Sequence, residues 1–304
     1  MFAAIVRTRG TRPHELLEAL ESLRLQALPC VPVVVVHGDS AALDRVGLIC
    51  KDETPPPRIL RASDTSRTVG YPINVGIDHC LAQIPDARYL FLLDDDDIVY
   101  PYFTSQIAAA FEESEADVVY ASSNRREPGQ AAVRAHLALP AHHLLRENFI
   151  PTNTFVMRAD ALRGCNVRAD EALRYFEDWH FLLRLLEAGL RFHAVPATLS
   201  EFRIVPDSDL SYRRDLTLWR ANEAHVRSYI NRTSFPLPGA ELAQIDSGAT
   251  PVEAGSRPAD QLLIGRLRQR VGELENSLSW RWTAPARSLL DAVLGWRRRK
   301  DPRR

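Results

Sequence analysis

Three runs of almost uninterrupted apolar residues mark the first hundred positions of the chain. They are Ala3–Val6, Val31–Val36 and Tyr89–Leu93. A short run of this kind, bounded by turn residues, is typical of a strand that is buried on both faces. Between the first two runs, leucines recur at helical spacing after Pro13, at positions 16, 17, 20 and 23. Two strands separated by a helix predict a parallel pair in a doubly wound α/β sheet.

Weaker patterns continue the alternation of strands and helices. The spacing predicts a helix over 103–113 and another that carries Phe181–Leu186 and ends at Gly189. The remaining stretches are expected to be an irregular connection over 51–61, a turn marked by Gly70, Asn74 and Gly76 before a helix through Leu81, strands over 117–120, 148–157, 191–195 and 198–204, and a loop over 207–211.

The composition changes beyond about residue 235. Prolines and glycines punctuate residues 236–258, which predicts a linker after a globular domain over 1–235. Leucines and a valine then repeat at spacings of three and four from Leu263 to Leu278, as in an amphipathic helix or a coiled coil that would form a homodimer. The tail 259–304 ends in a basic helix, which suits either the surface of an anionic membrane or packing on the globular domain.

Composition and charge limit the partners and the cellular location that the chain can have. The chain has 304 residues and a formal net charge of −1, so no overall field favours nucleic acid as a partner. Its four cysteines, at positions 30, 50, 80 and 165, have no CxxC spacing, which argues against a zinc site and a disulfide framework. The N-terminal apolar stretch is too short for a signal peptide, and no run approaches the roughly 20 apolar residues of a spanning helix. We therefore expect a cytoplasmic protein.

The third apolar run ends in four consecutive aspartates, Asp94–Asp97. Carboxylates cannot follow a strand into the core without a counter-charge, so we expect them at the carboxyl end of a central strand, where open α/β sheets bind ligands. Hard carboxylate oxygens favour Mg²⁺ or Mn²⁺, held together with the phosphates of a substrate. The alternative for a run of charges is a solvated acidic turn. The buried strand before this run favours the metal site.

Four motifs follow one another between residues 5 and 101: Ile5–Pro13, Val33–Ser40, Asn74–Ile77 and Leu93–Pro101. In this order they resemble the inverting family 2 glycosyltransferases, which have the GT-A fold (Rossmann-like, with a mostly parallel central sheet flanked by helices) and use nucleotide-sugar donors. Leu93–Pro101 matches the family's Leu-Asp-x-Asp-Asp-x-x-x-Pro segment, which contains its DXD motif. The resemblance implies that Asp94 and Asp96 hold a divalent metal, Mn²⁺ or Mg²⁺, and that the donor is bound by Thr8, Arg9, Asp39, Asn74, Gly76, Asp94, Asp95 and Arg203.

Phe176–Trp179, followed by Arg184, resembles the family's Glu-Asp-Trp segment, which supplies the catalytic base. The resemblance implies that Asp178 takes the proton of the acceptor hydroxyl, with Glu177 as the second choice, and that Trp179 and Arg184 lie on the acceptor side. From their own position, Glu177 and Asp178 equally suit a helix start, where carboxylates favour the positive end of the dipole. Within the aspartate run, Asp95 and Asp97 are expected to orient the loop or to meet solvent.

The leading hypothesis is a metal-dependent inverting glycosyltransferase that moves a sugar from a UDP-, GDP- or dTDP-sugar to a hydroxyl of a glycan or lipid-linked acceptor. Ser277–Arg287 resembles a tail found on bacterial glycosyltransferases of surface-polysaccharide assembly. That tail suggests work at the inner face of the cytoplasmic membrane. The alternatives are a nucleotidyltransferase of similar fold and a non-catalytic scaffold that has kept the fold.

Overall fold

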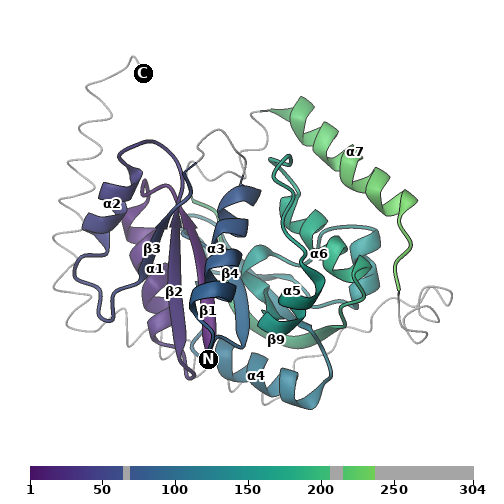
Figure 1. Ribbon diagram of the computed structural model, residues 1–304, viewed down its shortest axis with the longest axis horizontal. Coiled ribbons are helices and arrows are strands. Elements are labelled where there is room, and N and C mark those ends of the chain that lie inside the picture. Colours follow the sequence, from purple (N-terminus) through teal and green to yellow (C-terminus); the bar gives the residue numbers. More distant parts are fainter. Residues whose placement is uncertain (64–68, 206–214, 237–304) are drawn as a thin grey trace. The chain divides into compact units, whose positions relative to one another are not determined.

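A computed structural model of the chain describes residues 1–63, 69–205 and 215–236 (Figure 1). Helices and strands alternate through the described residues. The strands are β1 (Phe2–Thr8), β2 (Cys30–Val36), β3 (Arg58–Arg61), β4 (Tyr89–Asp94), β5 (Ile98–Val99), β6 (Val118–Arg126), β7 (Val133–His136), β8 (Phe155–Arg158) and β9 (Phe192–Arg203). The α-helices are α1 (Pro13–Arg24), α2 (Ala42–Ile49), α3 (Gly70–Gln83), α4 (Phe103–Glu113), α5 (Ala159–Cys165), α6 (Glu177–Glu187) and α7 (Leu216–Arg232), and short 3-10 turns span Ala141–Leu145 and Thr152–Thr154.

The strands form one mixed sheet in the order β3-β2-β1-β4-β8-β6-β9-β5, with β7 paired to β6. Its first four strands are parallel, β8 is antiparallel to both β4 and β6, and β9 is parallel to β6. The predicted α/β class, with a Rossmann-like parallel half flanked by helices, is confirmed. Parallel strands bring their carboxyl ends to one edge, so Thr8, Val36 and Asp94 end at the same edge.

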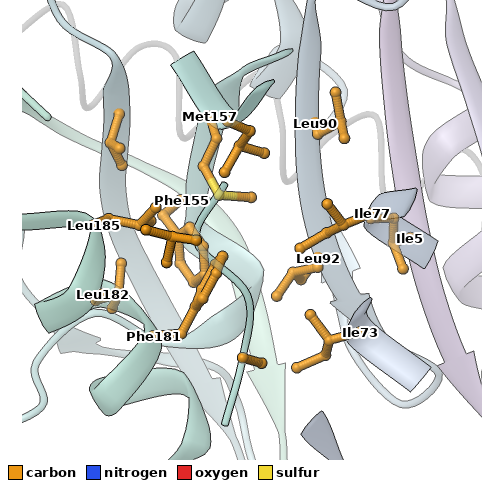
Figure 2. Close-up of a cluster of buried hydrophobic side chains, with 14 of the residues drawn as sticks. Ile5, Ile73, Ile77, Leu90, Leu92, Phe155, Met157, Phe181, Leu182 and Leu185 are labelled. Carbon is orange, nitrogen blue, oxygen red and sulfur yellow. The ribbon is translucent and has the colours of Figure 1, made fainter. Parts of the chain in front are cut away.

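The apolar runs are buried on both faces of the sheet because successive side chains point to opposite sides. Ile5, Leu90 and Leu92 contribute to the core on one face, whereas Val6 and Phe91 contribute to the core on the other. Figure 2 shows the first of these cores, where the strand residues meet α3, β8 and α6 through Ile73, Ile77, Phe155, Met157, Phe181, Leu182 and Leu185. Helix α6 is therefore anchored to the sheet by its apolar face.

Gly70, Asn74 and Gly76 lie within α3, so the predicted turn at these positions is wrong. Gly76 and Asn74 instead serve the packing of α3 against its neighbours. A Cβ on Gly76 would lie 2.3 Å from Cγ2 of Ile5, so only glycine lets the helix approach β1 this closely. Asn74 is buried and hydrogen-bonds to the loop before α6.

Other boundaries also differ from the prediction. The irregular connection over 51–61 ends in strand β3, and the two strands expected over 191–204 are a single strand, β9. Strand β9 stays continuous because its register with β6 shifts where Pro196 interrupts the pairing, as in a β-bulge. In the segment 148–157, only Phe155 onward is strand. Helices α2, α5 and α7 were not predicted, whereas the helix over 103–113 is confirmed.

The loop expected at 207–211, the linker 236–258 except for its first residue, and the tail 259–304 lie outside the described residues. Among the residues that are described, no helix has the length and apolar character needed to cross a membrane.

Candidate active site

The aspartate run lies at the carboxyl end of β4, as predicted, and next to the end of β1. Arg7 and Asp94 are register partners on these two strands. The backbone N–H of Asp97 donates to the Asp94 carbonyl over 3.1 Å, which closes a tight turn before β5. This turn holds the four aspartates at the edge of the sheet, three of them largely buried: Asp95, Asp96 and Asp97 are 2%, 8% and 1% exposed.

Arg7 joins the aspartate run to the start of α6. Its Nε donates to Oδ1 of Asp94 over 2.7 Å, and its Nη1 donates to Oε1 of Glu177 over 3.2 Å. Burial alone would lower the pKa of Arg7, but Asp94 and Glu177 outweigh it and raise the pKa, so the guanidinium stays charged. The two motifs that the sequence places far apart thus share one buried cation.

Thr8 and Arg12 hold the next two aspartates. Thr8 Oγ1 donates to Oδ2 of Asp95 over 2.5 Å, while Arg12 pairs with Asp95 over 3.3 Å and also with Asp96. Burial raises the pKa of Asp95 to about 6 and that of Asp96 to about 7, against the opposing effect of Arg12. Neighbouring aspartates raise both pKa values further. Burial and the neighbouring carboxylates therefore both disfavour the ionised forms of Asp95 and Asp96.

Asp97 and Arg203 fix the far side of the turn. The Arg203 backbone N–H donates to Oδ1 of Asp97 over 2.9 Å, and the Arg203 guanidinium contacts the Asp96 carbonyl and Glu18. Burial, followed by the charges of Asp96 and Asp94, raises the pKa of Asp97 well above its usual value. Asp97 orients the loop, as one of the two expectations had it. Solvent exposure of Asp95 and Asp97, the other expectation, is wrong.

The candidate base lies in the first turn of α6. The preceding residue, Phe176, has a left-handed backbone with φ of 64°, which turns the chain sharply before Glu177. Asp178 accepts hydrogen bonds from Asn148 Nδ2 over 2.9 Å and from the Trp179 backbone N–H over 2.7 Å. Burial raises the pKa of Asp178 despite these hydrogen bonds, and burial plus the charge of Asp178 raises the pKa of Glu177 to about 7.

The other predicted donor residues are spread along the edge of the sheet. Arg9 is exposed after β1, and its carbonyl accepts from Arg45 over 3.1 Å. Asp39 follows β2, where a hydrogen bond from Arg45 lowers its pKa. Asn74 and Gly76 lie inside α3 with the packing roles described above. Donor contacts by these four residues stay predictions.

The two residues predicted on the acceptor side have contacts within the protein. Trp179 is 2% exposed, and its indole Nε1 donates to the Leu144 carbonyl over 2.8 Å. Arg184 donates to the Arg168 carbonyl over 2.7 Å. Both contacts brace α6 against neighbouring loops, and a role toward the acceptor stays a prediction for both residues.

Three polar residues of the site were missed by the sequence reasoning: Arg7, Arg12 and Asn148. Arg7 carried a usable signal, because an arginine at the end of an otherwise apolar, buried strand needs a carboxylate partner.

The chemistry of the aspartate turn fits a divalent cation. Asp94 and Asp96 offer hard carboxylate oxygens, and the raised pKa of Asp96, to about 7, reflects burial among like charges that a cation would relieve. Two carboxylates form an incomplete coordination shell, of the kind that Mg²⁺ or Mn²⁺ completes with substrate phosphates and water. These residues therefore fit the metal that the resemblance implies.

Solved structures of similar fold come from S. aureus TarS. The chain is 19% identical to TarS 1–349 in complex with UDP, covering 80% of this chain and 69% of that one with a TM-score of 0.55. For TarS 1–349 in complex with UDP-GlcNAc, the identity is 18%, the coverage 80% and 70%, and the TM-score 0.60. At this identity the likeness establishes the fold alone. No curated protein sequence matches the chain.

The family described as glycosyl transferase family 2 matches residues 5–174. The match covers more than half of the chain and includes the second half of β1, all of β2 and the aspartate run, and it ends shortly before α6. This chain therefore belongs to glycosyl transferase family 2 and is a glycosyltransferase with the GT-A fold.

Proposed function

We propose that this enzyme transfers a sugar, with inversion and with a divalent metal, from a nucleoside diphosphate sugar to a hydroxyl of a glycan or lipid-linked acceptor. The observation that carries the proposal is the Arg7 link between Asp94 and Glu177, at 2.7 Å and 3.2 Å. It brings a candidate metal and diphosphate site next to two adjacent carboxylates, the buried Glu177 and the half-buried Asp178. The groups that bind the leaving diphosphate and the carboxylate that takes the acceptor proton would then both face one sugar.

The donor half comprises the aspartate turn and its arginines. Asp94 and Asp96 would hold Mn²⁺ or Mg²⁺ together with the donor diphosphate, and the metal would supply charge neutralisation for the leaving group. Arg12 now pairs with Asp95 and Asp96, and Arg203 contacts the Asp96 carbonyl. Both arginines are therefore within reach of any diphosphate at this turn. Thr8, Asp95 and Asp97 keep the turn in place.

The acceptor half is Asp178. In an inverting transfer the acceptor oxygen forms a bond to the anomeric carbon from one face while the bond to the diphosphate oxygen breaks on the other. The hydroxyl proton passes to a carboxylate, and the nucleoside diphosphate leaves with the bonding electrons. Asp178 is oriented for this by Asn148 and the Trp179 N–H, and its raised pKa makes it a better proton acceptor than an ordinary aspartate. Glu177 is engaged by Arg7, which favours Asp178 as the base.

Similarity supports the choice of donor and of cellular setting. TarS is a structural neighbour with UDP and UDP-GlcNAc bound, so UDP-sugars are the first donors to test. The tail residues Ser277–Arg287 support a role in the assembly of bacterial surface polysaccharides. With its basic end, the tail 259–304 would hold the enzyme at the inner face of the cytoplasmic membrane, separated by the linker 236–258 from the catalytic domain 1–235.

Release of UDP from a panel of UDP-sugars, with and without Mn²⁺, tests the proposal. Asp96→Ala and Asp178→Asn should each lower turnover about a hundredfold or more. Their matched controls are Asp86→Ala, an exposed loop aspartate, and Asp160→Asn, an exposed aspartate in the first turn of α5; both should keep wild-type turnover. Full activity of Asp96→Ala and Asp178→Asn would refute these assignments, and release of pyrophosphate from a nucleoside triphosphate would indicate a nucleotidyltransferase instead.

A further inference from the structure

A second cluster of side chains that could ligate a metal lies where the loop before α6, α6 itself and α7 meet. Oδ2 of Asp170 is 3.5 Å from Nδ1 of His180 and 3.9 Å from Nε2 of His225. One ligand atom from each of the three residues lies within 4.8 Å of the others. Asp170 belongs to the loop, His180 to α6 and His225 to α7, and α6 and α7 contact each other.

Among the described residues, no group hydrogen-bonds to the ring of His180. The residue is 5% exposed, and both ring nitrogens are buried without a donor or acceptor within bonding geometry. A buried polar group without a partner is costly, so such groups in native proteins commonly indicate a ligand. Burial lowers the pKa of His180 to about 4, which keeps the imidazole neutral near pH 7 with a lone pair available. The Nδ1 edge of this ring points toward Asp170.

We propose that Asp170, His180 and His225 bind a divalent transition metal, with Zn²⁺ as the best fit. Two imidazoles and one carboxylate are a ligand set typical of zinc, at bond lengths of about 2.0–2.1 Å. Tetrahedral geometry at that length separates ligand atoms by about 3.3 Å. The two separations from Asp170, 3.5 and 3.9 Å, are close to this value, and the ligand atoms of the two histidines lie within 4.8 Å of each other. His225, whose side chain is 45% exposed, leaves the fourth position open to a water molecule.

This site is chemically distinct from the aspartate turn, whose ligands are all oxygen atoms. It also differs from the zinc site that the scattered cysteines argue against, because it contains no cysteine. A metal bound here would hold α7 against the segment that precedes α6. Asn222 of α7 already accepts from the backbone N–H groups of Arg174 and Tyr175, each over 3.1 Å. A metal on Asp170, His180 and His225 adds a second link between α7 and the segment that carries Glu177 and Asp178.

Cobalt spectroscopy on the full-length, tag-free, chelator-treated protein tests the proposal, because Co²⁺ in a tetrahedral nitrogen-containing site gives strong visible absorption that octahedral oxygen sites lack. The wild type should bind one equivalent of Co²⁺ with such bands, and Zn²⁺ should displace it. His225→Ala and Asp170→Asn should weaken Zn²⁺ binding at least about tenfold, since loss of even an outer hydrogen-bond partner costs about 10–100-fold. His193→Ala, an exposed histidine on β9, is the matched control and should bind normally.

Two further measurements separate this site from the catalytic one. Asp96→Ala should keep the tetrahedral cobalt spectrum, because Asp96 is not a ligand here. Zn²⁺ should raise the Tm of the wild type and of Asp96→Ala but not that of His225→Ala. The proposal is overturned if the wild type has no tetrahedral cobalt spectrum, or if His225→Ala and Asp170→Asn bind Zn²⁺ as tightly as the wild type. Either result would leave His180 as a buried histidine that rotates to hydrogen-bond Asp170.

Discussion

Replacing Arg7 with methionine removes a cation that contacts both Asp94 and Glu177. Arg7 is 9% exposed and the Glu177 side chain is 11% exposed, so this pair is buried, whereas the Asp94 side chain is 30% exposed and contributes less. Breaking a buried pair by removing one partner costs about 3–5 kcal/mol, because the remaining carboxylate is left without its counter-charge. Methionine keeps most of the side-chain volume, so lost packing adds little. We expect the free energy of unfolding to fall by about 3 kcal/mol.

The same substitution should change the pH dependence of transfer. Arg7 lowers the pKa values of Glu177 and Asp178, in opposition to burial, which raises both. Without Arg7 these pKa values rise further, so the base is protonated at a higher pH. The acid limb of the kcat/KM profile should therefore move to higher pH. Arg7→Lys, which keeps the charge but cannot reach both carboxylates with a planar fork, should fall between the wild type and Arg7→Met.

Urea denaturation and the pH profile of UDP release measure the two effects. A fall in stability without a shift of the acid limb would mean that the ion pairs of Arg7 stabilise the fold but do not set the pKa of the base. If Arg7→Met unfolds within about 0.5 kcal/mol of the wild type and keeps the wild-type pH profile, the reasoning about the shared cation is refuted.

Three further predictions address the metal, the packing of α3 and the tail. In metal-free protein, the free energy of unfolding should rise as the pH falls from about 8 to about 5.5, because the raised pKa values of Asp95 (about 6) and Asp96 (about 7) make the folded state bind more protons than the unfolded state. Saturating Mg²⁺ should make the free energy of unfolding depend less on pH. A free energy of unfolding that rises with increasing pH in metal-free protein would contradict the assignment. Gly76→Ala should lower the free energy of unfolding, measured in urea, by about 1–3 kcal/mol, because the new Cβ meets Ile5. Gly164→Ala is the control and should not destabilise the protein, because no heavy atom lies within 4 Å of a Cβ at that position. Equal stability of the two variants would count against the packing role. Replacing the basic residues 297–299 with serine should reduce co-sedimentation with anionic vesicles, at about 1 kcal/mol per residue, and leave neutral vesicles unaffected; unchanged binding to anionic vesicles would exclude this contact.

The part of the site that follows a buried strand could be predicted from the sequence. An apolar run that ends in charge identifies the carboxyl end of a strand, and this located Asp94–Asp97 at the sheet edge. The link from Arg7 to Glu177 could not be predicted, because the two residues are 170 positions apart and a single sequence carries no signal for that contact. A similar limit applies to Asp170, His180 and His225, which only the packing of α7 brings together.

Glycine and asparagine illustrate a second limit. Both residues are typical of turns, and this led to the wrong prediction of a turn around Asn74 and Gly76. Glycine is equally required where a helix lies very close to a strand, as Gly76 does against Ile5. Likewise Asn74 bridges buried backbone groups of the loop at Ala169. Local sequence does not distinguish these uses, since the neighbouring element that makes the difference is distant in the chain.

The central claim is that Asp96 holds the donor while Asp178 takes the proton, in one site with two separable roles. Calorimetric titration of UDP in the presence of Mn²⁺ tests it most directly, with the wild type, Asp96→Ala and Asp178→Asn measured side by side. We expect Asp96→Ala to lose at least about tenfold in UDP affinity, because a metal ligand is removed. Asp178→Asn should bind UDP within about twofold of the wild type, because proton transfer is needed for the reaction and not for binding. Wild-type UDP affinity in Asp96→Ala would contradict the account.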